Sequence, residues 1–268
     1  MVNLREDTRE SIAKLTLMDD IFMNKVFEND TERTALLLRI ILNNDKIKVI
    51  KAVTQQKLKN LSGHDLHLDI LAQEENGRLF NVEIQRDDEG APVKRARYYS
   101  SVLDVHFLDA GEKYDKLNDV YVIFITEHDV LHRNHPIYNV ERVIKDDGTA
   151  FADGSKIVYV NASCQSDTPL GRLMQDFNCA NPDKMHYKEL ADRVSFFKKT
   201  KEGEKTMTDI IELYAAKRAK EAVQKTAQAR NIELAKDLLS EGETIERTVR
   251  LSKLSEAEVR ELASKLTA

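Results

Sequence analysis

Two acids and an amide interrupt a pair of alternating apolar segments in the stretch LDILAQEENGRLFNVEIQ at residues 68–85. Asp69 lies in the first segment, and Glu83 and Gln85 lie in the second. If both segments are β-strands, alternate side chains share a face, so Glu83 and Gln85 point the same way. Two carboxylates that face each other across adjacent strands repel, unless a positive charge lies between them.

The loop between the two segments decides whether the acids meet. A two-residue turn puts Asp69 across from Ile84, which points to the opposite face. A three-residue loop at residues 75–77 puts Asp69 across from Glu83, because the register moves by one residue. Gly77 can supply the left-handed residue that such a loop needs. We therefore predict a three-residue loop and a facing pair of acids.

A facing pair of carboxylates suits a hard divalent cation. Mg²⁺ takes oxygen ligands, often one or two carboxylates with water and substrate phosphate, and Mn²⁺ is expected to substitute for it. Such an ion polarises a phosphorus centre and lowers the pKa of a bound water. Gln85 is no base, but it can orient the attacking water or donate to a phosphate oxygen.

The alternative is that the acids lie on the solvent face of an edge hairpin and bind nothing. His64 and His67 are three residues apart, so on a strand they point to opposite faces. We interpret them as surface or packing residues rather than as joint metal ligands.

The surrounding sequence predicts the elements that must position these side chains. Apolar spacing favours helices at 17–43 and 92–110, with Pro92 at the start of the second and Gly111 at its end. Strands are expected at 47–58, 119–126 and 156–162, in addition to the two acid-bearing segments. This order indicates a mixed α/β (α+β) fold whose first three strands are antiparallel neighbours.

The two ends of the chain differ from this middle part. Residues 1–16 are polar and predict a loose arm or a marginal helix. From about residue 164 the pattern is helical, and residues 205–240 contain neither Gly nor Pro. Two short helices are expected after that, and Ser255 with Glu258 has the spacing of a capping box. We place the domain boundaries at 1–16, 17–200 and 201–268.

Composition excludes some classes of protein. The 268 residues are 41% hydrophobic and 32% charged, as in a globular protein that buries a core. No run of about 18 apolar residues suggests a membrane span, and no secretory signal opens the sequence. Cys164 and Cys179 lie outside any CxxC pair and are expected to be free thiols in the cytoplasm. The net charge of −5 argues against a nucleic-acid coat protein but not against a nuclease.

Several stretches match a known family in combination. They are MDDIFMNKVF at 18–27, the acid-bearing stretch at 68–85, KRARYYSSVLD at 94–104 and GEKYDKLNDVYVIFIT at 111–126, with TPLGRLMQDF and LADRVSFFKKT further on. Together they resemble the PD-(D/E)XK nuclease superfamily, and more narrowly the bacterial PD-(D/E)XK nuclease family transposases, which are related to recombination-promoting nucleases. The resemblance implies a restriction-endonuclease-like core with a helical C-terminal extension.

The resemblance also implies roles for single residues. Asp69 and Glu83 match the metal ligands of the second and third strands, and Asp20 matches the acid of the first helix, with Asp19 beside it. Gln85 stands where the superfamily has lysine. The implied activity is Mg²⁺-dependent DNA endonuclease action of mobile-element or recombination type. The alternative is a catalytically inactive regulatory member that binds DNA or protein, because the lysine is replaced.

Basic residues and the tail add candidate partners. Lys94, Arg95 and Arg97 begin the predicted 92–110 helix, where cations and a helix N-terminus can bind a DNA phosphate. Alternatively they form ion pairs with the acids at 87–89. The last helix is not basic, so for the tail we favour an interaction or homo-oligomerisation role over reading DNA as half a helix-turn-helix.

Overall fold

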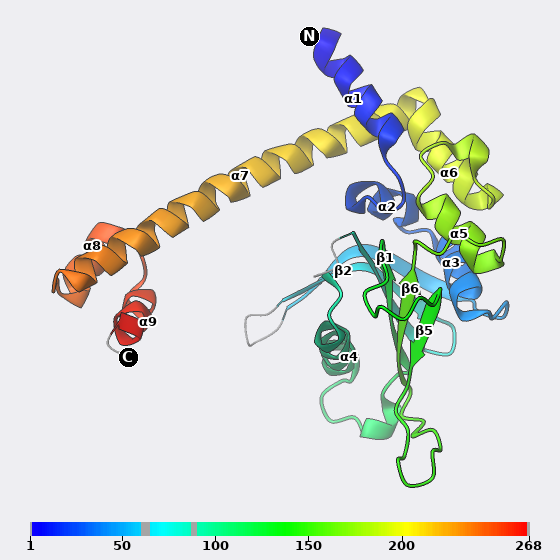
Figure 1. Cartoon of the computed structure of the whole chain (residues 1–268), viewed down its shortest axis with the longest axis horizontal. Coiled ribbons are helices and arrows are strands. Elements are labelled where there is room, and N and C mark those ends of the chain that lie inside the picture. The colour runs from blue at the N-terminus through cyan, green and yellow to red at the C-terminus, as the bar shows by residue number, and fades with distance from the viewer. Residues whose placement is uncertain (1, 60–64, 87–89, 267–268) are drawn as a thin grey trace. The chain divides into compact units, whose positions relative to one another are not determined.

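A six-stranded mixed sheet carries the acid-bearing segments in the computed structural model, which describes residues 2–59, 65–86 and 90–266 (Figure 1). The strands are β1 (Val49–Leu58), β2 (Leu66–Glu74), β3 (Leu79–Gln85), β4 (Val120–Thr126), β5 (Ile137–Val140) and β6 (Ser155–Asn161), in the spatial order β1-β2-β3-β4-β6-β5. As predicted, the first three strands are antiparallel neighbours. β4 lies parallel to β3, β6 lies parallel to β4, and β5 closes the edge antiparallel to β6.

The helices of the described residues account for most of the rest. They are α1 (Val2–Lys14), α2 (Asp20–Phe27), α3 (Thr31–Leu42), α4 (Val93–Phe107), α5 (Pro169–Phe177), α6 (Lys188–Lys199), α7 (Lys201–Ser240), α8 (Ile245–Ser252) and α9 (Glu256–Leu266). None of them combines the length and apolar character that crossing a membrane requires.

Helices cover both faces of the sheet. On one face α4 packs through an aromatic layer in which Phe124 of β4 contacts Tyr99 of α4 and Tyr159 of β6, with ring centroids 6.0 and 5.4 Å apart. On the other side, α2 packs against α6 through the rings of Phe22 and Phe197. Figure 1 shows α2, α3 and α5 across the sheet from α4. The third strand is therefore enclosed on both faces.

The helical stretch predicted at 17–43 is two helices, α2 and α3, which are separated at residues 28–30, where Asn29 takes a left-handed conformation. The structure departs from the predicted elements in two places. Helix α4 ends at Phe107 through an extended Leu108, so Gly111 is not its stop and lies in the following turn. Strand β5 was not predicted, because its four residues, two half-buried and two exposed, show no clear alternation.

Two compact units make up the chain, Met1–Thr208 and Asp209–Ala268. The second holds its own small apolar core around Ala235, Leu254 and Val259. The two predicted short helices are present as α8 and α9. The capping box at the start of α9 is confirmed, because Glu258 N donates to Ser255 Oγ and Ser255 N donates to Glu258 Oε2.

Candidate metal and phosphate site

The loop between β2 and β3 has three residues, as predicted. Glu74 N donates to Arg78 O at 2.9 Å, and Gly77 adopts the left-handed φ of +91°. The strand register pairs Ile70 with Val82, so the next position along pairs Asp69 with Glu83. The three-residue length of the loop therefore places Asp69 directly across from Glu83.

Each carboxylate of the pair is hydrogen-bonded to the backbone of the opposite strand. Ile84 N donates to Asp69 Oδ2 at 2.8 Å, and Asp69 N donates to Glu83 Oε1 at 3.2 Å. At this point, carboxylate oxygens accept hydrogen bonds that backbone carbonyl oxygens accept elsewhere in the sheet. Both acids are fixed in position by the strands that carry them.

Burial distinguishes this pair from acids on a solvent face. Glu83 is 0% exposed and lies on a central strand, so the alternative of an edge hairpin with solvated acids is wrong. Asp69 is half-buried. His67 is exposed, as expected of a surface histidine, and His64 lies outside the described residues.

The enclosed site disfavours two negative charges. Burial, together with the charge of Asp69, raises the pKa of Glu83 to about 8. Burial likewise raises the pKa of Asp69 to about 7, with a contribution from the charge of Asp20. Carboxylates in such a place ionise fully when a cation joins them.

Arg95 supplies a positive charge from inside the fold. Its Nη2 lies 3.5 Å from Glu83 Oε2 and 2.6 Å from the Tyr99 hydroxyl oxygen. Its Nη1 lies 3.5 Å from Gln85 Oε1 and donates to the carbonyl oxygen of Gly90. Its guanidinium carbon lies 5.1 Å from the centre of the Tyr99 ring. The guanidinium of Arg95 therefore points into the fold and contacts both Glu83 and Gln85 of β3.

Asp20 and Asp19 have different surroundings. Asp19 precedes α2, accepts from Thr16 N at 2.7 Å and pairs with Arg86 at 3.3 Å. Asp20 is exposed, and its Oδ1 accepts from the side-chain amides of Asn24 and Gln55. Asp19 is thus occupied by Thr16 and Arg86, whereas the charge of Asp20 acts on Asp69.

The acid pair fits a hard divalent cation in its donor chemistry. Carboxylate oxygens are the ligands that Mg²⁺ and Mn²⁺ prefer, and the pKa values of both acids stay raised by burial although Arg95 is near, so a further cation would stabilise their ionised forms. Within the described residues, no group of three or more His, Cys, Asp or Glu side chains is close enough to hold an ion together. Asp69 and Glu83 are therefore the two carboxylates that face each other here, and Asp20 acts on Asp69 through its charge.

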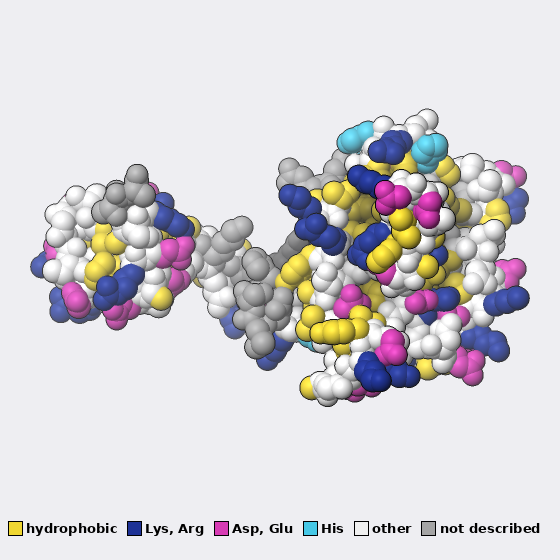
Figure 2. Space-filling view, turned by 90° about the horizontal axis from the view of Figure 1, so that it is seen from below, with side chains coloured by type: hydrophobic (Ala, Val, Ile, Leu, Met, Phe, Trp, Pro, Cys, Tyr) yellow, Lys and Arg dark blue, Asp and Glu magenta, His cyan; other side chains and the backbone are white. Residues whose placement is uncertain are grey.

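The other two predicted phosphate contacts are placed differently from Arg95. Lys94 and Arg97 are exposed in the first turns of α4. The acids at 87–89, considered as their partners, lie outside the described residues. On the face shown in Figure 2, Lys and Arg side chains are interspersed with Asp and Glu side chains.

Two contacts of this site were missed by sequence reasoning. The inward position of Arg95 follows from Tyr99, which lies one helical turn later on the buried face of α4, so the spacing i, i+4 was an available signal. The contact from Gln55 to Asp20 joins β1 to α2 across 35 residues, and no local pattern marks it.

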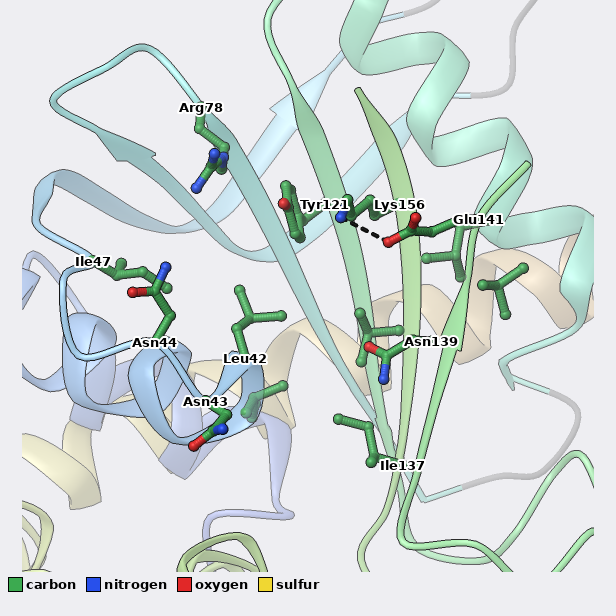
Figure 3. A pocket seen from close by; sticks show the side chains of 14 residues that line it. Leu42, Asn43, Asn44, Ile47, Arg78, Tyr121, Ile137, Asn139, Glu141 and Lys156 are labelled. Carbon is green, nitrogen blue, oxygen red and sulfur yellow. Dashed lines mark ion pairs between the residues drawn. The ribbon is translucent and has the colours of Figure 1, made fainter. Parts of the chain in front are cut away.

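A second hollow lies elsewhere in the larger unit. A cleft of about 300 Å³ opens between the end of α3 and strands β4, β5 and β6 (Figure 3). Its charged groups are already paired: Lys156 with Glu141 at 2.7 Å and Arg78 with Glu74 at 3.2 Å, and both cations lie against the Tyr121 ring. The cleft offers no facing acids and is not the site described above.

Comparison with protein families decides the relationship. The model of the PD-(D/E)XK nuclease family transposases matches residues 17–168, more than half of the chain. The chain belongs to this family. Comparisons with curated proteins and with solved structures gave no match.

Membership of the PD-(D/E)XK nuclease family transposases agrees with the fold. The order of α2 and α3, three antiparallel strands, α4 and a parallel β4 is the restriction-endonuclease-like core that the resemblance implied. The matched region contains Asp20, the acid pair, Gln85 and the first turns of α4. The family is one of nucleases of mobile-element type.

Proposed function

We propose that the protein is a Mg²⁺-dependent DNA endonuclease of mobile-element or recombination type, acting in the cytoplasm. The facing pair of half-buried Asp69 and fully buried Glu83 is the observation that carries the proposal. The backbone hydrogen bonds and Arg95 only partly offset the cost of placing two carboxylates together, because both pKa values stay raised, and a divalent cation would offset the rest.

Asp69 and Glu83 would hold the metal, and Asp20 would contribute directly or through water. When bound, Mg²⁺ or Mn²⁺ supplies Lewis acidity at the phosphate and a water of lowered pKa. The backbone groups of Ile84 and Asp69 keep both carboxylates in place before the ion arrives. This preorganisation limits the reorganisation that binding requires.

Gln85 and Arg95 together would take the place of the motif lysine. Gln85 Oε1 is directed to Arg95, which leaves the amide nitrogen as the group that can donate to a phosphate oxygen. Arg95 brings the positive charge to Glu83 from the following helix. Of the two roles open to Gln85, this contact favours binding a phosphate oxygen over orienting the attacking water.

Lys94 and Arg97 would position the DNA strand by contacts to backbone phosphates. Both are exposed at the N-terminal turns of α4, close in sequence to the acid-bearing strand. Arg95 is left out of this role, because its guanidinium is already bound within the site.

The proposed domains are an arm at 1–16, a nuclease domain at 17–200 and a helical tail at 201–268. For the tail we propose self-association rather than DNA reading. On α9, Arg260 pairs with Glu256 at 2.7 Å and Lys265 pairs with Glu261, so the basic groups of that helix are neutralised within it. A helix that reads DNA needs free basic groups.

Plasmid nicking tests the proposal. The wild-type protein is expected to nick supercoiled DNA with Mg²⁺ and not with EDTA, and Glu83→Ala and the isosteric Glu83→Gln are expected to lose this activity. Circular dichroism checks that both variants fold. Undiminished nicking by folded Glu83 variants would sink the proposal. Binding of DNA without any cleavage by the wild type would instead identify a regulatory member of the family.

A further inference from the structure

Two side-chain amides hold one oxygen of Asp20. Asn24 Nδ2, one turn further along α2, donates to Asp20 Oδ1 at 2.6 Å. Gln55 Nε2, from β1, donates to the same oxygen at 3.2 Å. With Oδ1 doubly bound, Oδ2 is the oxygen available to a further ligand. The carboxylate is therefore oriented by a helix and a strand together.

The backbone of Gln55 is unusual for a strand. Its φ is +55°, in the left-handed region, although the flanking pairs of Thr54 with Ile70 and Gln56 with Leu68 keep the register of β1 against β2. Glutamine is not among the residues that favour this region. A strained conformation of this kind is retained where the surrounding structure requires it, and it is concentrated at functional sites.

The register places Gln55 in line with the acid pair. Counting between its flanking pairs, Gln55 lies opposite Asp69, and Asp69 lies opposite Glu83. A row of one amide and two acids thus crosses β1, β2 and β3. The side chain of Gln55 is exposed, so core packing does not require its conformation.

Asn24 gives an independent sign that the amides are arranged around Asp20. Its Oδ1 is buried and has no hydrogen-bond partner within the described part of the chain. A buried polar atom without a partner is unfavourable, and it needs a reason. The reason here is the short bond from Nδ2 to Asp20, which fixes which way the amide faces.

We infer that Gln55 is a positioning residue that aims the free oxygen of Asp20 at the metal held by Asp69 and Glu83. The inference rests on the proposed function and extends it to a residue outside the acid motif. Groups that orient ligands or near-ligands of a metal affect its affinity by about 10- to 100-fold when they are removed.

Metal affinity and stability together test this role. Gln55→Gly removes the amide and relieves the backbone, whereas Gln55→Ala removes the amide alone. Both are expected to bind Mn²⁺, titrated by electron paramagnetic resonance, roughly tenfold more weakly than the wild type. In the absence of metal, the melting temperature of Gln55→Gly is expected to be no lower than that of the wild type. Gln55→Asn, which tolerates the left-handed backbone, should recover part of the affinity. Gln56→Ala is the matched control with unchanged affinity.

The outcomes separate this inference from the proposed function. If the Gln55 variants bind Mn²⁺ as the wild type does while Glu83→Ala does not, the positioning role is wrong and the metal site stands. If the wild type binds no Mn²⁺, or Glu83→Ala binds it equally well, both proposals are wrong. A loss of affinity in Gln55→Gly with undiminished melting temperature supports positioning, because a purely structural residue would lower both.

Discussion

The carboxylates of Asp69 and Glu83 are each anchored to the backbone of the strand that carries the other. Ile84 N binds Asp69 Oδ2, and Asp69 N binds Glu83 Oε1. This reciprocal arrangement keeps two acids of raised pKa together in an enclosed site. The stability of the metal-free protein must therefore depend on pH.

Without metal, the free energy of unfolding should fall as pH rises from about 4 to about 8. The unfolded carboxyls titrate near 3.8 and 4.5, whereas the folded pair titrates at about 7 and about 8. Between these values the folded state binds more protons, so stability decreases with pH. Urea denaturation in EDTA at pH 5 and pH 8 measures this difference.

Glu83→Gln is the control for the pH dependence, since it removes one titrating group and keeps the shape. Its stability should change less between pH 5 and pH 8 than that of the wild type. Adding Mg²⁺ at pH 8 should restore stability to the wild type alone. Equal slopes for the two proteins would show that the pair does not titrate as described.

Arg95→Ala should abolish most of the cleavage activity. The change leaves Glu83 buried without its nearby cation and frees the amide of Gln85. We expect a fall in the cleavage rate of about 10²-fold, the scale for losing one electrostatic contact in an active site. Arg95→Lys should recover only part of it, because lysine cannot span Glu83, Gln85 and Tyr99 at once. Single-turnover cleavage at saturating Mg²⁺ measures both.

Lys94→Ala and Arg97→Ala should weaken DNA binding without stopping catalysis. Both residues are exposed. Each substitution should therefore reduce the slope of the logarithm of the binding constant against the logarithm of the salt concentration by about one. Binding isotherms at several salt concentrations, with a metal-free Glu83→Gln background, give the slope. A large fall in the cleavage rate at low salt and saturating DNA would contradict the assignment.

Local rules were sufficient for the hairpin and for the acid pair. Side chains alternate along a strand with a period of two, and a three-residue loop needs a left-handed residue, which Gly77 supplies. These two rules determine which residues face each other. The same rules placed β1, β4, β6 and α4 within a few residues. These features depend on neighbours in the sequence, which is why they could be predicted.

Contacts between distant segments were beyond those rules. Alternation groups Glu83 with Gln85 but does not reveal that α4 covers their face, so the complete burial of Glu83 was not foreseen. In the sequence Arg95 is one of three similar cations, but in the structure it lies one helical turn before Tyr99 and points inward. The left-handed Gln55 has no sequence signature, and its partner Asp20 lies in another element 35 residues away.

Gly90→Ala should impair cleavage by displacing Gln85. A Cβ at position 90 would lie 2.2 Å from Gln85 Oε1, so the amide must leave Arg95 to make room. The expected loss equals that of Gln85→Ala, and the double variant should lose no more, since both changes act on one contact. Gly242→Ala is the control: it strains a left-handed glycine with open space around it, and it should reduce stability while leaving the cleavage rate unchanged. Losses of Gly90→Ala and Gln85→Ala that add in full would mean that position 90 acts by another route.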